Sequence, residues 1–202
     1  MALLFSAPSL ANYPGQWWDK VDDVNAPSWE ILPQAAEHGK TVILSKRNEL
    51  GILSNFAPTP FVFEGKKYAS MEGAWQSMKY PEGKKDERYG KDSLPFSRVD
   101  VENMSSFEAK RAGGFASDLM KKHGVNFVTY KGKVMKYRTK EKGKHYDLIV
   151  RMMREKLRQN PEVRRILKLT GKLILLPDHH TKKDAPPAWK YNQIWMELRK
   201  SL

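Results

Sequence analysis

SMEGAWQSMKY, residues 70–80, carries the clearest helical period in the chain. Its apolar side chains recur at i, i+3, i+4 and i+7, and so share one face of an α-helix, at Met71, Ala74, Trp75 and Met78. Ser70 offers an N-cap oxygen before this face, and Pro81 and Gly83 interrupt the period after it. We therefore expect a helix over residues 71–79 that buries one side in the core.

Polar side chains form a second face of the same helix. Glu72, Gln76 and Lys79 follow one another at i, i+4 and i+7, which allows them to line one wall of a pocket. The same charges are also typical of a helix face in water, where a Glu–Lys pair contributes little stability. Trp75, at core spacing, fits packing better than stacking on a ligand. The residues alone leave both interpretations open.

Short strands are predicted upstream of this helix. Thr41–Ser45 is apolar and β-branched, and Pro60–Phe63 and Lys66–Tyr68 flank a Glu-Gly turn in the pattern of a hairpin. Residues 1–40 lack any sustained period and contain several prolines together with Trp17, Trp18 and Trp29. We expect an extension over 1–40, whose tryptophans pack on the domain or on a partner, followed by a domain over 41–202.

Helical patterns dominate the remainder of the chain. A helix is expected from about Phe107, capped by Ser105 or Ser106, to the stop signal His123-Gly124. Further helices are predicted at Tyr146–Arg158, Pro161–Leu169 and Asn192–Leu202, with a short strand or buried segment at Leu173–Leu176. The predicted fold class is α+β, a mostly helical single domain with a small antiparallel β element.

Composition restricts the chemistry. The 202 residues include no Cys, which excludes disulfides, thiolate metal sites and a cysteine nucleophile. Residues 1–10 lack the basic start and long apolar run of a secretory signal, and no stretch resembles a membrane span, so we expect a cytoplasmic protein with no membrane partner. A net charge of +13 favours phosphates, nucleotides or nucleic acid as partners, although a solvated basic surface explains it equally well.

Four parts of the chain resemble the NADAR family, whose fold is also called YbiA-like, and they follow one another in the family's order. Leu53–Phe56, leading into the hairpin, is similar to the Ser-Asn-Phe turn, and residues 71–80 are similar to the helix with Glu, a later Gln and a later Lys. AKRAGG, residues 109–114, is similar to the Ala-Lys-x-x-Gly-Arg segment. Residues 152–171 resemble the family's long helix and Thr-Gly turn, and the segment around Asp184 and Trp189 its Asp-x-x-Trp-Gly loop.

The resemblance implies an N-glycosidase that hydrolyses the bond between a ribose and a nitrogenous base. Family members act on phosphoribosylaminopyrimidine intermediates of riboflavin synthesis or remove ADP-ribose from guanine, so the implied substrate is a phosphorylated or ADP-linked ribosyl compound, with nucleic acid as one carrier. The sugar becomes cationic as the base departs, and a fixed carboxylate beside the anomeric carbon lowers that barrier. The implied catalytic residues are Glu72 and Asp184.

The implied binding residues have side chains suited to a nucleotide. Lys79 and Arg111 suit phosphate oxygens, and Trp189 presents a ring for a flat base. The remaining members of the implied substrate-binding set are Ser54, Asn55, Phe56 and Gln76. Ser and Asn in a short loop are also explained by ordinary turn chemistry, because both side chains bond to nearby backbone groups.

The chain departs from the family pattern at several positions. Gly73, Gly114 and Glu141 stand where the family has His, Arg and Trp, and the last loop carries Pro186, Pro187 and Lys190 in place of the expected residues. These departures favour an alternative function, a non-catalytic basic module that binds nucleotides or nucleic acid. A scaffold that uses the Trp-rich extension is a third interpretation.

Two adjacent histidines, His179 and His180, stand next to Asp178. Adjacent side chains project apart in most backbone conformations, and no spaced third ligand follows them. We therefore expect no metal site, and hydrolysis of an N-ribosyl bond requires no cofactor.

Overall fold

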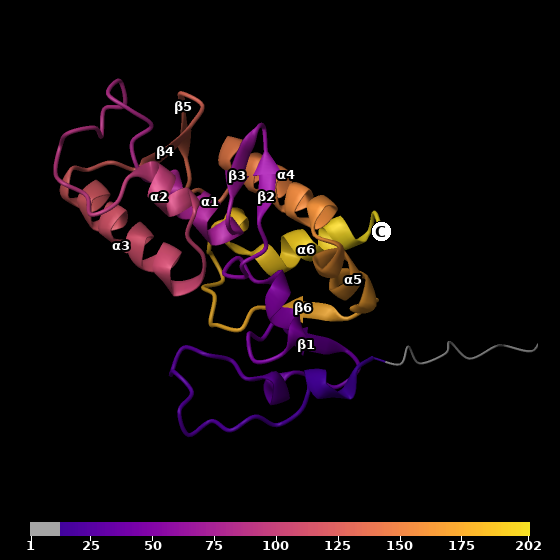
Figure 1. Ribbon diagram of the computed structural model, residues 1–202. Helices are drawn as coiled ribbons and strands as arrows, with labels where there is room; N and C mark the ends of the chain where they lie inside the picture. The colour runs from indigo at the N-terminus through magenta and orange to yellow at the C-terminus, as the bar shows by residue number, and fades with distance from the viewer. Residues whose placement is uncertain (1–12) are drawn as a thin grey trace, which may run out of the picture.

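Helices dominate the structure, a computed structural model that describes residues 13–202 (Figure 1). The predicted fold class, α+β and mostly helical with small β elements, is confirmed. Its elements are β1 (Thr41–Ile43), β2 (Phe61–Phe63), β3 (Lys66–Tyr68), α1 (Met71–Ser77), α2 (Arg98–Glu102), α3 (Ser106–Lys122), β4 (Phe127–Tyr130), β5 (Lys133–Lys136), α4 (Lys144–Gln159), α5 (Pro161–Leu169), β6 (Ile174–Leu176) and α6 (Tyr191–Arg199). None of these helices is long and apolar enough to cross a membrane. Residues 1–10, from which no secretory signal is expected, lie outside the described residues.

Helix α1 lies at the centre, packed against α2, α3 and α4. It begins as predicted, because the Ser70 hydroxyl accepts a hydrogen bond of 2.9 Å from the Gly73 backbone N–H. Met71, Ala74 and Met78 are buried, as their spacing predicted. The helix ends at Ser77, two residues before the predicted end at residue 79.

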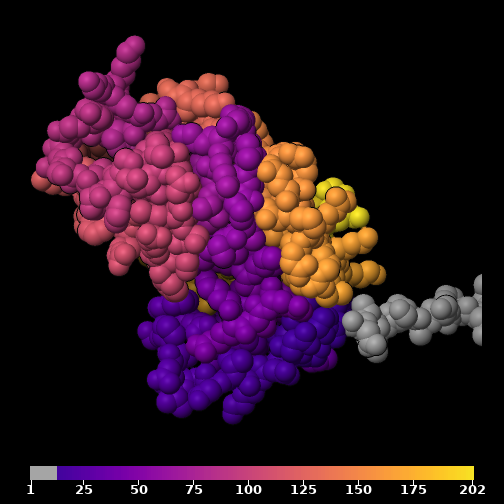
Figure 2. Space-filling view, viewed as in Figure 1, coloured from indigo at the N-terminus to yellow at the C-terminus, as the bar shows by residue number. Residues whose placement is uncertain are grey.

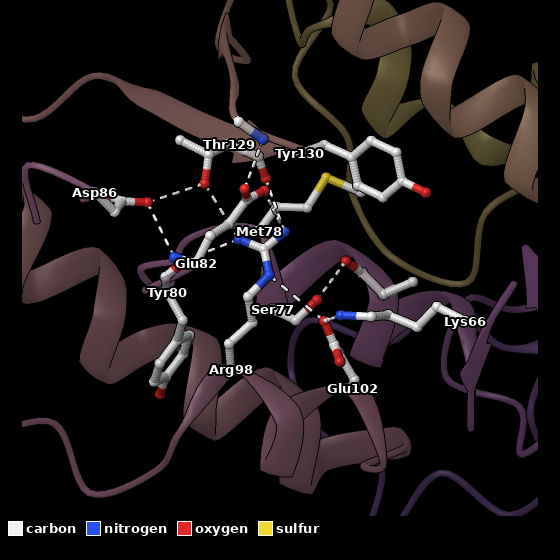
Figure 3. A network of polar contacts seen from close by, with 12 residues as sticks. Lys66, Ser77, Met78, Tyr80, Glu82, Asp86, Arg98, Glu102, Thr129 and Tyr130 are labelled. Atoms are coloured by element: carbon white, nitrogen blue, oxygen red, sulfur yellow. Dashed lines mark hydrogen bonds and ion pairs between the residues drawn. The ribbon is translucent and has the colours of Figure 1, made fainter. Parts of the chain in front are cut away.

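Two arginines bind the carbonyl groups that follow α1. Arg98, on α2, donates to the carbonyl oxygens of Tyr80 (3.0 Å) and Thr129 (2.8 Å), and its guanidinium lies 3.4 Å from the Glu102 carboxylate (Figure 3). Arg88 is almost completely buried and donates to the same Tyr80 oxygen at 3.1 Å. These bonds satisfy carbonyls that a helix end leaves free, and they join α1 to α2 and β4.

The strands form three separate pairs rather than one sheet. β2 and β3 make the predicted antiparallel hairpin, with Glu64 and Gly65 in the left-handed conformation at its turn. β4 and β5 form a second antiparallel hairpin, which was not predicted from the sequence. β1 and β6 pair in parallel, Val42 opposite Leu175, which differs from the expectation of antiparallel elements alone.

The described part of the N-terminal segment, residues 13–40, contributes to the main core. Trp17 is fully buried and Trp18 is 9% exposed, and both belong to the same apolar cluster as the helices. The Trp17 indole N–H donates to the Glu49 carboxylate at 2.7 Å, and that of Trp18 to the Thr41 carbonyl at 2.8 Å. Buried indoles with satisfied N–H groups hold this segment against β1 and its neighbours.

Candidate active site

A cavity of about 450 Å³ lies where several segments of the chain meet. Its walls come from the N-terminal segment, the chain after β1, the loop 54–56, α1 and the residues just after it, the start of α3, the chain after β5 and the chain that follows β6. Figure 2 shows an opening between the N-terminal segment and α3, with the C-terminal third of the chain visible behind it. The volume suits a small-molecule ligand. Seven of the site residues expected from the sequence line it, namely Ser54, Asn55, Phe56, Glu72, Gln76, Lys79 and Trp189.

Glu72 is a buried carboxyl group in the wall of this cavity. Only 7% of the residue is exposed, so the interpretation of its helix face as a solvated surface does not hold. The Gln76 amide donates to its carboxylate at 2.7 Å, and the Glu72 backbone N–H donates to the Asn55 carbonyl at 2.8 Å. Burial raises the pKa of Glu72, opposed by the Gln76 hydrogen bond and by the charge of Lys79. A fixed carboxylate with a raised pKa is suited to accept a proton near neutral pH.

Gly113 leaves the space that the Gln76 side chain occupies. A Cβ atom built on Gly113 would lie 1.7 Å from the Gln76 Oε1 atom and 2.2 Å from its Cδ atom. On the next residue of α3, Gly114, a Cβ atom would meet nothing within 4 Å. The missing side chain at position 113 therefore positions Gln76, and through it the Glu72 carboxylate.

We expect Gly113→Ala to raise the pKa of Glu72 further, because displaced Gln76 no longer donates to the charged form. If Glu72 acts as a base, the acid limb of the activity profile then moves to higher pH. Gly114→Ala is the matched control and should leave the profile unchanged. Rate measurements between pH 4 and 9 give the answer, and identical profiles for the two variants would contradict this role of Gly113.

Three buried polar atoms around the cavity have no hydrogen-bond partner within the described protein. They are the side-chain oxygens of Asn55, Gln76 and Tyr191. Buried polar groups are nearly always paired, because an unpaired one loses its hydration without compensation. Only one further such atom occurs among residues 13–202, in Asn48. This concentration marks the cavity as a place where a polar ligand is expected.

Cations outnumber acids around the cavity. The lining contains Lys46, Lys79, Lys110 and Arg138 against Glu72 and Asp178. Lys79 is 9% exposed and donates to the Ser117 hydroxyl at 2.8 Å. Burial lowers the pKa of Lys79 to about 8, although the Glu72 charge raises it. The cavity therefore favours an anionic ligand.

Asp178 is the second buried acid of the cavity. No role was predicted for it from the sequence, because no metal site was expected at Asp178 and the two histidines that follow it. It is 1% exposed and forms an ion pair with Lys46, and its carboxylate lies 3.1 Å from the His179 Nδ1 atom. Burial acts to raise its pKa, but the hydrogen bonds from His179 and Lys46 prevail and lower it. Asp178 lies two residues after the end of β6, and an acid just beyond a short apolar strand was the available signal.

Two of the expected site residues lie outside the cavity lining. Asp184 is exposed in the chain after β6, and Arg111 is exposed on α3. Arg111 follows Lys110, which does line the cavity, so the basic residue that faces the site is one position earlier than expected. Other lining residues not expected from the sequence are Trp29, Phe107, Tyr137, Arg138 and Tyr191.

The two tryptophans proposed for stacking differ in environment. Trp75 packs edge-on against His145, with ring centroids 4.6 Å apart, and burial lowers the pKa of His145 to about 4, so the histidine stays neutral at pH 7. Trp189 lies 6.5 Å from Trp75 and is 40% exposed. Trp75 thus has both a packing role and a face in the cavity lining, and Trp189 offers the more accessible ring.

The departures from the family pattern have separate structural settings. A Cβ atom on Gly73 would lie 2.5 Å from the Met104 carbonyl oxygen, so α1 and the end of α2 leave no room for a side chain there. Gly114 and Glu141 are exposed and lie outside the cavity lining. Within residues 13–202, no three His, Asp or Glu side chains gather as a metal ion would require.

Lys156, on α4, supports the cavity loop from behind. It is fully buried, and its ammonium donates to the Ser54 carbonyl at 2.9 Å. The neighbouring Leu53 carbonyl accepts a bond of 2.6 Å from the Trp195 indole N–H. No acidic side chain among the described residues pairs with Lys156, and burial lowers its pKa to about 7.

Lys156→Met should stabilise the fold by about 2 kcal/mol at pH 6.5, because a buried ammonium group without an acidic partner is removed while the side-chain volume is kept, even though the bond to the Ser54 carbonyl is lost. The pKa of Lys156 is about 7 in the folded protein, below its ordinary value of 10.5. Between these two pH values the unfolded chain binds more protons than the folded protein, so the destabilisation of the fold by Lys156 shrinks as pH rises. The gain should therefore largely vanish near pH 10. Urea unfolding at both pH values tests this, and an equal or larger gain at pH 10 would contradict it.

The fold and the site thus define an α+β protein with a cation-lined cavity built around a buried carboxyl group. No protein-family model matches the chain, and no curated protein matches it. Among solved structures, the NMR structure of the E. coli protein YbiA is similar to it, with 22% sequence identity, coverage of 80% of this chain and 84% of that chain, and a TM-score of 0.49. A likeness of this degree concerns the fold alone, and the residue assignments rest on the geometry of the cavity.

Proposed function

We propose that the protein is an N-glycosidase of the kind found in the NADAR family, which hydrolyses the bond between a base and a phosphorylated or ADP-linked ribose. The observation that carries this proposal is the buried Glu72 carboxylate, held by Gln76 in the wall of a cavity whose other charges are mainly positive. This arrangement supplies one fixed negative charge for a sugar cation and several positive ones for its phosphate.

Glu72 has two tasks in the proposed reaction. Its charge stabilises the oxocarbenium-like sugar as the C–N bond lengthens, and its carboxylate takes a proton from the water that attacks the anomeric carbon. The departing nitrogen keeps the electrons of the C–N bond and takes a proton from solvent, and Glu72 returns the proton of the attacking water to solvent after the base has left. Asp178 takes the place proposed from the sequence for Asp184, since it is the other acid that lines the cavity, and its pairing with Lys46 keeps it ionised.

The remaining lining residues account for binding of the substrate. Lys79 supplies a positive charge one helical turn beyond Gln76, where a ribose phosphate finds a donor. Ser54 and Asn55 belong to the cavity lining and supply polar groups for the ribose hydroxyls. Trp189 and Trp75 present rings on which a flat base stacks.

Incubation with two substrates tests the proposal. One is a phosphoribosylaminopyrimidine, and chromatography measures the free pyrimidine that is released. The other is DNA that carries ADP-ribosylated guanine, and the released ADP-ribose is measured. We expect turnover of at least one of them. Salt-sensitive binding of DNA or nucleotide without turnover of either compound would replace the enzyme by the non-catalytic basic module.

A further inference from the structure

Three aromatic rings, from the N-terminal segment, the loop 54–56 and the start of α3, meet in one wall of the cavity. Phe56 and Phe107 contact edge to face, with ring centroids 5.1 Å apart, and Trp29 lies 6.3 Å from Phe107. Trp29 is 40% exposed and Phe107 is 52% exposed, although all three line the cavity. Exposed aromatic surface in a cavity wall can pack against a planar ligand.

Two ammonium groups lie over the same pair of rings. The Lys46 Nζ atom is 5.1 Å from the Phe56 centroid and 5.7 Å from that of Trp29, and the Lys110 Nζ atom is 5.8 Å from both. Lys46 is also paired with Asp178, whereas Lys110 has no acidic partner among residues 13–202. The wall therefore combines ring faces with at least one ammonium free to bind an anion.

Hydrogen bonds on both sides of Trp29 fix this part of the wall to the rest of the protein. The carboxylate of Glu30, next to Trp29, receives two hydrogen bonds from Arg47, of 2.8 and 2.6 Å. The backbone N–H of Ile31 donates to the Asp178 carbonyl at 2.8 Å. Trp29 is thus positioned before any ligand arrives, which reduces the entropy lost on binding.

We infer that Trp29, Phe56 and Phe107, with Lys46 and Lys110, form a subsite for a planar ring that carries phosphate, such as a nucleoside diphosphate. A bare anion would make no contact with the aromatic rings that needs their faces, and an uncharged planar ligand would not be attracted by the two ammonium groups. Trp189 and Glu72 line the same cavity. The inference rests on the proposed function for one point only, that the bound nucleotide is part of the ribosyl substrate.

Calorimetric binding of ADP, adenosine, pyrophosphate and ribose 5-phosphate to the full chain tests the subsite without any turnover. We expect ADP to bind more tightly than each of the other three. Trp29→Ala should weaken ADP binding about tenfold and leave pyrophosphate binding unchanged, while Trp29→Phe restores most of the loss. Lys110→Ala should weaken both ADP and pyrophosphate, and its exposed neighbour variant Arg111→Ala should weaken neither.

Unchanged ADP binding in Trp29→Ala, with circular dichroism like that of the parent, would overturn the inference. So would Trp29-dependent binding of a single-stranded oligonucleotide in the absence of ADP binding, because that indicates a strand-binding surface. Failure of the proposed function has a different signature, since ADP then binds through Trp29 while no ribosylated compound is turned over.

Discussion

Glu72→Gln is expected to lower the rate of N-ribosyl bond hydrolysis by about 100- to 10,000-fold. The amide has nearly the same shape and still offers an oxygen to the Gln76 N–H, but it carries no charge and accepts no proton from water. Binding of substrate or of ADP should change little, because the groups assigned to the phosphates and rings are untouched. Single-turnover kinetics with calorimetry separate the two effects.

The matched control for this variant is Glu108→Gln. Glu108 is exposed in the first turn of α3 and lies outside the cavity lining, so the same chemical change is made close to the site without entering it. Parent-like turnover is expected. If Glu72→Gln also turned over like the parent, its carboxylate would have no part in the reaction and the glycosidase proposal would be lost.

Gly73→Ala is expected to destabilise the fold by about 3 kcal/mol. The new methyl group would lie 2.5 Å from the Met104 carbonyl oxygen and 2.8 Å from that of Val101. Both are backbone atoms that cannot rotate away, so α2 must move off α1. The melting temperature should fall by about 10 °C, and urea unfolding gives the change in free energy.

Gly114→Ala provides the contrast in stability. It too replaces a helical glycine, but nothing lies within 4 Å of the new atom, and alanine is the better helix former. We expect a gain of about 0.5–1 kcal/mol. A similar loss in both variants would mean that the close approach of α1 and α2 does not explain the glycine at position 73.

Local signals predicted the elements that local interactions build. The N-cap at Ser70, the Glu64-Gly65 turn and the apolar period of α4 each depend on a few neighbouring residues, and each appears in the structure. Helix α2 was missed although Ser97 and Asp100 form a capping box, because five residues are too short for a visible period. The turn at Lys131-Gly132 was a readable signal for β4 and β5.

The candidate site was predictable only where it coincides with such local motifs. Glu72, Gln76 and Lys79 share one helical face, so their spacing predicted that they lie together, whereas only the structure shows that this face lines a cavity. Trp29 and Asp178 reach the same cavity from opposite ends of the chain, which are brought together by the parallel pairing of β1 with β6 and by the hydrogen bond from the Ile31 N–H to the Asp178 carbonyl. No periodicity in a single sequence reports a contact of that kind.

That pairing has a consequence for synthesis of the protein. Val42 pairs with Leu175, so the cavity cannot form during translation until the chain up to Leu175 has been made. Contacts between residues so distant in sequence also slow folding, since a large loop must close before they form. Until then Trp17 and Trp18 lack the core residues that bury them in the folded protein, and the nascent chain exposes apolar surface of the kind that chaperones bind.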